Sequence, residues 1–252
     1  MKKVLTIVFI GLLSSGAFAQ GHSIGNQWMV AGLRGIFNST WLLNQNQLND
    51  KALKYKPSWG YWAGVMLGLH YTQWGAIFIE GYYATLSQKQ VSAGAVDSLK
   101  WSRKTNLTYY DFPVLLHFVP REYDYVEAGI QYSVLANAKG SYNAGTQDLK
   151  SNFEKSNLAI VFGWGGPLWA DGGGLLDLGI RLTYGLSDII GSQGGKGNDY
   201  HSPGEGIPGT PKAYKFTNTA TAGFVLSYNF DMGWWLHDSC KRKYKFFLFN
   251  HG

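Results

Sequence analysis

The chain has 252 residues, a length that suits one domain of barrel or sandwich type. Aromatic residues make up 16% and glycine occurs 33 times, while charged residues reach only 15%, against roughly 25% in soluble domains. This composition is typical of transmembrane β-barrels, which need an apolar outer band and aromatic girdles. The net charge of +6 is modest and forms no extended basic face, which argues against nucleic-acid binding.

The first 19 residues have the pattern of an export signal peptide. Lys2 and Lys3 provide the positive end, Val4–Leu13 is apolar, and Ala17–Ala19 has the small-x-small form of a cleavage site. The mature chain is therefore expected to begin at Gln20. The alternative, a membrane anchor, is disfavoured because a spanning helix needs about 17–25 apolar residues.

Eight later segments alternate apolar with small or polar residues, the period-two pattern of a strand with two different faces. In the second segment, Tyr61, Val65 and Leu69 share one face, while Gly60, Gly64 and Gly68 share the other. The predicted strands are Trp28–Asn38, Trp59–Tyr71, Ala76–Leu86, Asn106–Val119, Tyr123–Ala138, Ser156–Leu168, Leu175–Ile189 and Phe216–Phe230.

The connections between these segments alternate between long and short. The long ones are predicted at 39–58, 87–105, 139–155 and 190–215, and the short ones at 72–75, 120–122 and 167–174. Outer-membrane barrels have long extracellular loops and short periplasmic turns. The sequence therefore predicts an all-β fold: an eight-stranded antiparallel up-and-down transmembrane β-barrel over residues 20–230, in the bacterial outer membrane, with both termini periplasmic.

Strand parity places several charged and histidine side chains on the inner face. An eight-stranded barrel is just wide enough for side chains to fill it, so a plugged lumen is expected. Buried charges must be paired, which predicts a structural charge network, with a gated proton or ion path as the alternative. The predicted interior network comprises Arg34, His70, Glu80, Asp111, His117, Glu127, Asp177 and Arg181.

No residue pattern indicates catalysis, a metal or a cofactor. Spacing enforces no serine–histidine pair of the kind that a hydrolase needs. The six histidines also lack close spacing such as His-x-x-x-His, so we expect no metal site. The chain is therefore expected not to be an enzyme.

Residues 231–252 form a predicted C-terminal periplasmic extension with aromatic and basic character. Two interpretations are open: a tail lying on the inner leaflet, with basic residues at headgroups, or a docking segment for a protein partner. The residues expected to contact partner or membrane are Trp234, Trp235, Lys241, Arg242, Lys243, Lys245, Phe246, Phe247 and Phe249.

Four motifs resemble those of the PorT-type outer-membrane β-barrel family of the Bacteroidota. They are the acidic-residue-before-proline strand in Tyr109–Leu116, the aromatic-x-Glu-Ala-Gly strand in Tyr125–Ile130, the Leu176–Arg181 strand followed by Tyr184–Leu186, and the aromatic strand end Tyr228–Phe230. The resemblance implies an eight-stranded outer-membrane barrel. Some family members serve the type IX secretion and gliding machinery.

These features favour a non-enzymatic accessory or structural subunit of an outer-membrane complex, in type IX secretion and gliding or in nutrient uptake. Expected partners are outer-membrane lipid and proteins at the periplasmic side or in the membrane. A small gated channel and a surface binder acting through its extracellular loops are the alternatives.

Overall fold

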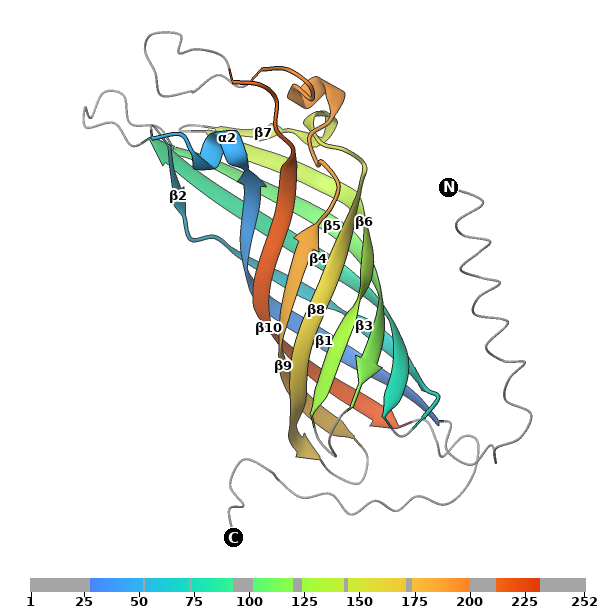
Figure 1. Cartoon of the computed structure of the whole chain (residues 1–252). Helices are drawn as coiled ribbons and strands as arrows, with labels where there is room; N and C mark the ends of the chain where they lie inside the picture. The colour runs from blue at the N-terminus through green and yellow to red at the C-terminus, as the bar shows by residue number, and fades with distance from the viewer. Residues whose placement is uncertain are drawn as a thin grey trace, which may run out of the picture.

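The protein is a closed barrel of antiparallel strands, seen in a computed structural model that describes residues 28–51, 53–72, 74–92, 102–119, 124–142, 145–170, 174–199 and 212–231 (Figure 1). The eight barrel strands are β1 (Trp28–Asn44), β3 (Trp59–His70), β4 (Gly75–Ser92), β5 (Ser102–Phe118), β6 (Tyr125–Tyr142), β8 (Ser156–Ala170), β9 (Leu175–Gly185) and β10 (Thr217–Asp231). Each pairs with the next, and β10 pairs with β1. The predicted eight-stranded up-and-down barrel is confirmed.

Short elements lie where the long connections were expected, at the upper end of the barrel in Figure 1. They are α2 (Gln45–Leu48), β2 (Leu53–Lys56), β7 (Gly145–Asp148) and the 3-10 turns η3 (Lys150–Asn152) and η4 (Ser192–Gly194). β2 pairs with β4, and β7 pairs with β6. Within the described residues no helix is long and apolar enough to cross a membrane.

The strand pairing fixes the stagger of the barrel. Following partners once around the ring leads from Gly75 to Thr85, ten positions further along the same strand. Such a stagger tilts the strands by about 35–45° to the barrel axis, and an eight-stranded barrel is just wide enough for side chains to fill it.

The two faces of each strand differ as alternation predicts. On β5 the buried side chains Leu107, Tyr109 and Leu115 alternate with exposed ones such as Phe112 and Leu116. Exposed large apolar side chains occur on all eight barrel strands, which makes the outer surface apolar far beyond the patches of a few hundred Å² that soluble monomers tolerate.

Several predicted strand ends were wrong, because about half of each predicted loop 39–58, 87–105 and 139–155 is paired strand, partly as continuations of barrel strands and partly as β2 and β7. The β4–β5 hairpin stays paired as far as Val91 and Ser102. Backbone hydrogen bonds need no apolar side chain, so a hairpin can extend beyond the apolar zone with polar residues on both faces.

Two other boundaries were wrong for local reasons. β9 ends at Gly185 rather than Ile189, because Asp188 Oδ1 accepts hydrogen bonds from the backbone N–H groups of Ile190 and Thr217, both at 3.1 Å. β8 continues through the predicted turn 167–174 as far as Ala170, with a register shift between Pro167 and Trp169. Proline cannot donate to the ladder, and a bulge accommodates it.

Candidate functional site: a charge network inside the barrel

Four charged side chains meet inside the barrel, one from every second strand around the ring. They are Arg34 on β1, Glu80 on β4, Glu127 on β6 and Arg181 on β9, and none is more than 3% exposed. Two guanidinium and two carboxylate groups thus compensate one another. Their mutual hydrogen bonds hold the four side chains in one layer across the lumen.

The contacts within this layer are short and convergent. Arg181 donates from Nε to Glu127 Oε1 at 2.6 Å, from Nη1 to Glu80 Oε2 at 2.7 Å and from Nη2 to Glu80 Oε1 at 3.2 Å. Arg34 Nη1 donates to Glu80 Oε1 and, at 3.3 Å, to Glu127 Oε2. Each carboxylate therefore binds both guanidinium groups, the arrangement that a buried ion cluster needs to offset its desolvation.

Glycines beside the charged residues give these long side chains their room. Gly163 on β8 lies between Glu127 and Arg181 in the strand register. A Cβ at position 163 would lie 2.5 Å from Glu127 Oε1 and 2.7 Å from its Cγ. Because residue 163 has no side chain, Glu127 can cross over β8 to reach Arg181.

Aromatic side chains complete the layer. The Tyr82 hydroxyl donates to Glu80 Oε2 at 2.9 Å and accepts from Arg181 Nη1 at 3.3 Å. The guanidinium carbons of Arg34 and Arg181 lie 6.0 and 5.9 Å from the ring centres of Phe78 and Tyr82. Neither aromatic residue was predicted from the sequence as part of the network, although their spacing of two from Glu80 indicates the same inward face.

His117 extends the network from β5. Its Nε2 lies 2.8 Å from Glu127 Oε2, and its ring stacks between Phe78, at a centroid distance of 4.0 Å, and Tyr125, at 5.0 Å. The half-buried His70 contacts Phe78 edge-on, with ring centres 5.8 Å apart. The structure thus brings together five of the eight predicted interior residues, and the ring of Phe78 separates His70 from them.

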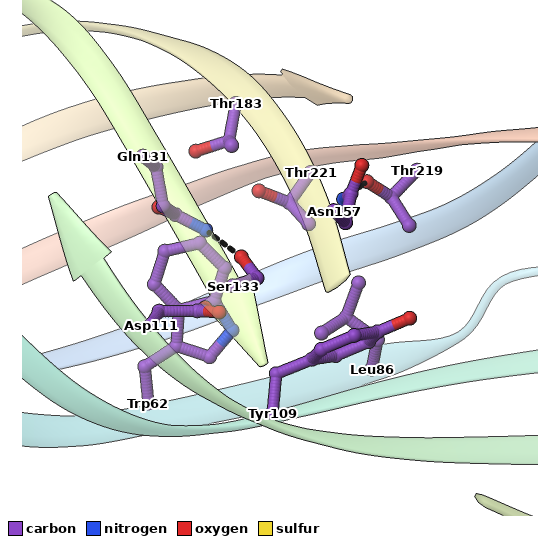
Figure 2. A pocket seen from close by; sticks show the side chains of 10 residues that line it. All are labelled: Trp62, Leu86, Tyr109, Asp111, Gln131, Ser133, Asn157, Thr183, Thr219 and Thr221. Atoms are coloured by element: carbon purple, nitrogen blue, oxygen red, sulfur yellow. Dashed lines mark hydrogen bonds between the residues drawn. The ribbon is translucent and has the colours of Figure 1, made fainter. Parts of the chain in front are cut away.

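Asp111 and Asp177 face the interior, but neither forms an ion pair within the described residues. Asp177 accepts a hydrogen bond from Asn229 Nδ2 on β10. Asp111 is 1% exposed and lines a cavity of about 10 Å³, at the lower limit for one water molecule. Figure 2 shows Asp111 beside Ser133, whose Oγ accepts from Gln131 Nε2 at 3.1 Å. The cavity is lined by Trp62, Leu86, Tyr109, Asp111, Gln131, Ser133, Asn157, Thr183, Thr219 and Thr221.

Three residues of the network could in principle ligate a metal. Glu80, His117 and Glu127 each offer one ligand atom, and these atoms lie within 4.8 Å of one another. Arg34 and Arg181 already bind both carboxylates, so a divalent cation here would stand beside two fixed positive charges. The donor set suits an ion-paired plug better than a metal centre.

The predicted signal peptide and the predicted contact residues of the tail lie outside the described residues. The tail residues are Trp234, Trp235, Lys241, Arg242, Lys243, Lys245, Phe246, Phe247 and Phe249. Their contacts with membrane or partner stay a prediction.

No protein-family model and no curated protein matches the chain, so the PorT-type resemblance stays a prediction. Among solved structures, the chain is similar to Ail, the attachment invasion locus protein of Yersinia pestis, at 9% identity and a TM-score of 0.39 over 81% of this chain and 99% of Ail. It is also similar to outer membrane protein OprG from Pseudomonas aeruginosa, at 12% identity and a TM-score of 0.39 over 84% of this chain and 98% of OprG. Neisserial surface protein A is similar at 10% identity and a TM-score of 0.39, over 80% of this chain and 97% of that protein. The fold assignment rests on this chain's own strand pairing.

Proposed function

We propose that the protein is a non-enzymatic barrel of the bacterial outer membrane, with a closed lumen and periplasmic termini, that serves as an accessory or structural subunit of a membrane assembly. The observation that carries this proposal is the combination of an apolar outer face with a four-charge layer across the interior. A barrel with this arrangement offers lipid and partner surfaces on its outside rather than a passage through its centre.

The outer face supports the membrane location. Its apolar side chains include Leu33, Val65 and Leu116, each more than 55% exposed in the isolated chain. Aromatic pairs lie towards both ends: Phe37 stacks on Trp59 at 5.4 Å, and Trp74 meets Phe118 edge-on at 5.7 Å. Closed strand pairing leaves no unsatisfied sheet edge in the barrel wall, which is the condition for crossing lipid.

The assembly role can be specified further. The motif resemblance favours the type IX secretion and gliding machinery, and a nutrient-uptake complex is the other candidate. Purification of the full chain at its native expression level should yield stoichiometric partners, whose identities distinguish the two. Recovery of the barrel alone in intact native membranes would contradict the assembly role.

The tail provides a second arm of this experiment. Deleting residues 237–252 should release a periplasmic partner while leaving the barrel folded, which a heat-dependent gel shift reports. Full retention of the partner after the deletion would contradict docking through the tail.

A surface-binding role is the second candidate, because the hairpins continue as ordered strands beyond the apolar belt. The β4–β5 hairpin and the added strands β2 and β7 form a sheet of polar residues there. Shortening the β4–β5 hairpin should then abolish binding of whole cells to their target surface. Unchanged binding would contradict this role.

A further inference from the structure

Three lysines stand in one row across three neighbouring strands at the hairpin end of the barrel. Lys56 on β2 pairs with Lys89 on β4, and Lys89 pairs with Lys104 on β5. Directly opposite residues share a face of the sheet, with Cβ atoms about 4.5–5.5 Å apart. Lys54 lies two residues before Lys56, on the same face of β2. All four side chains are exposed.

Among the described residues, none compensates the charge of this row. The other residues paired with these lysines are Val91, opposite Lys54, and Ser141, opposite Lys104, and neither is acidic. Across the described ranges no ion pair joins any of the four to a carboxylate. Lys139 differs, because Asp148 lies directly opposite it. Like charges placed opposite one another destabilise a sheet, so the row points to an anion from outside the chain.

The row faces away from the lumen, on the same side of the wall as the apolar belt. Lys89 has the strand parity of the exposed Ile79 and Tyr83, whereas Glu80 and Tyr82 point inward. Lys104 likewise has the parity of the exposed Tyr110.

The row also lies beside the aromatic border of the apolar belt. The backbone N–H of Lys89 donates to Ser58 Oγ at 2.9 Å. Ser58 directly precedes Trp59, which is 57% exposed and stacks on Phe37. Since aromatic residues mark the border of the apolar zone, where lipid headgroups begin, the row lies at headgroup level, beside the lipid rather than over the lumen.

We propose that Lys54, Lys56, Lys89 and Lys104 form a binding site for the phosphate groups of anionic glycolipids in the leaflet that surrounds the hairpin end. This inference rests on the proposed membrane location. Each ammonium group offers three donors to phosphate oxygens, and several within reach of one headgroup bind it together. The phosphate then supplies the negative charge that the residues paired with these lysines do not provide.

The test uses the full mature chain in phosphatidylcholine vesicles, with or without a bisphosphorylated glycolipid such as lipid A. The variant is K56Q/K89Q/K104Q, and the matched control is K150Q/K155Q/K212Q, which removes the same charge from exposed positions elsewhere. Thermal unfolding is followed by the gel shift between folded and unfolded barrel, and bound glycolipid is measured by mass spectrometry after detergent extraction.

The phosphorylated glycolipid should raise the Tm of the wild type and the control by several degrees and co-purify with both. The row variant should lose most of this rise in Tm and should retain little bound glycolipid. In pure phosphatidylcholine the row variant should be at least as stable as the wild type, because mutual repulsion is removed.

An equal rise for the row variant and the wild type would overturn the proposal. It would also be overturned if dephosphorylated glycolipid, or inorganic phosphate at the same concentration, produced the full rise. Failure of the wild type to insert into either kind of vesicle would instead contradict the membrane location on which the proposal rests, and the gel shift distinguishes that case.

Discussion

Glu127 and Arg181 are 54 residues apart in the sequence, yet Arg181 Nε donates to Glu127 Oε1 at 2.6 Å inside the barrel. The contact spans an intervening strand, β8, at the point where that strand carries Gly163. The layer of four charges thus depends both on its ionic partners and on the absence of a side chain between them.

Gly163→Ala should therefore destabilise the barrel, because the new Cβ would fall within 3 Å of three Glu127 atoms that the arginines hold in place. Overpacking of this kind costs about 1–3 kcal/mol. Gly81→Ala is the matched control, since a Cβ at Gly81 meets nothing within 4 Å. Urea unfolding of the vesicle-inserted protein gives the unfolding midpoints of both variants. Equal midpoints for the two variants would show that Gly163 does not make room for the network.

Removing one charge of the network should destabilise the barrel more than removing one positive and one negative charge together. Arg181→Gln leaves Glu80 and Glu127 facing Arg34 alone, and breaking a buried ion pair from one side costs about 3–5 kcal/mol. The double variant E80Q/R181Q restores balance between Arg34 and Glu127, so it should unfold at higher urea than R181Q. A double-mutant cycle gives the coupling energy. Additive losses would contradict a shared network.

Two inward-facing acids should respond in opposite ways to amide substitution. Glu127 binds two arginines, so Glu127→Gln should destabilise by about 3–5 kcal/mol. No described cation pairs with Asp111, so Asp111→Asn removes a buried carboxyl group without an ionic partner and should leave stability unchanged or higher. The unfolding midpoints of the two variants at neutral pH test this contrast. A larger loss of stability for Asp111→Asn than for Glu127→Gln would contradict the view that Glu127, and not Asp111, holds the network together.

The sequence predicted this interior only in part, and the reason is geometric. Alternation identified Arg34, Glu80, Glu127 and Arg181 as inward-facing, since parity is a property of one strand alone. Which of them share a level depends on the stagger of ten positions around the ring, which no single strand encodes. That stagger sets Glu127 level with Arg181 but places Asp111 beside Ser133 and Tyr82. The hairpin extensions were missed for another reason: polar strands outside lipid lack an apolar face.

A charge on the apolar belt should disrupt insertion. Val65 lies midway along β3 and is 58% exposed, so Val65→Arg should cost about 2–4 kcal/mol if this face meets the bilayer centre. Thr146→Arg, on the exposed strand β7, is the control and should insert normally. The inserted fraction is measured by flotation of vesicles after urea dilution. Equal insertion of both variants would place Val65 away from lipid.

Potassium efflux from loaded proteoliposomes tests most directly whether the barrel sits in lipid with its lumen closed by the charge layer. The inserted copies are counted by their folded gel shift, so that a lack of insertion is not mistaken for closure. We predict that vesicles carrying many inserted copies retain potassium as well as protein-free vesicles do. Efflux that rises in proportion to the number of inserted copies would contradict a closed lumen.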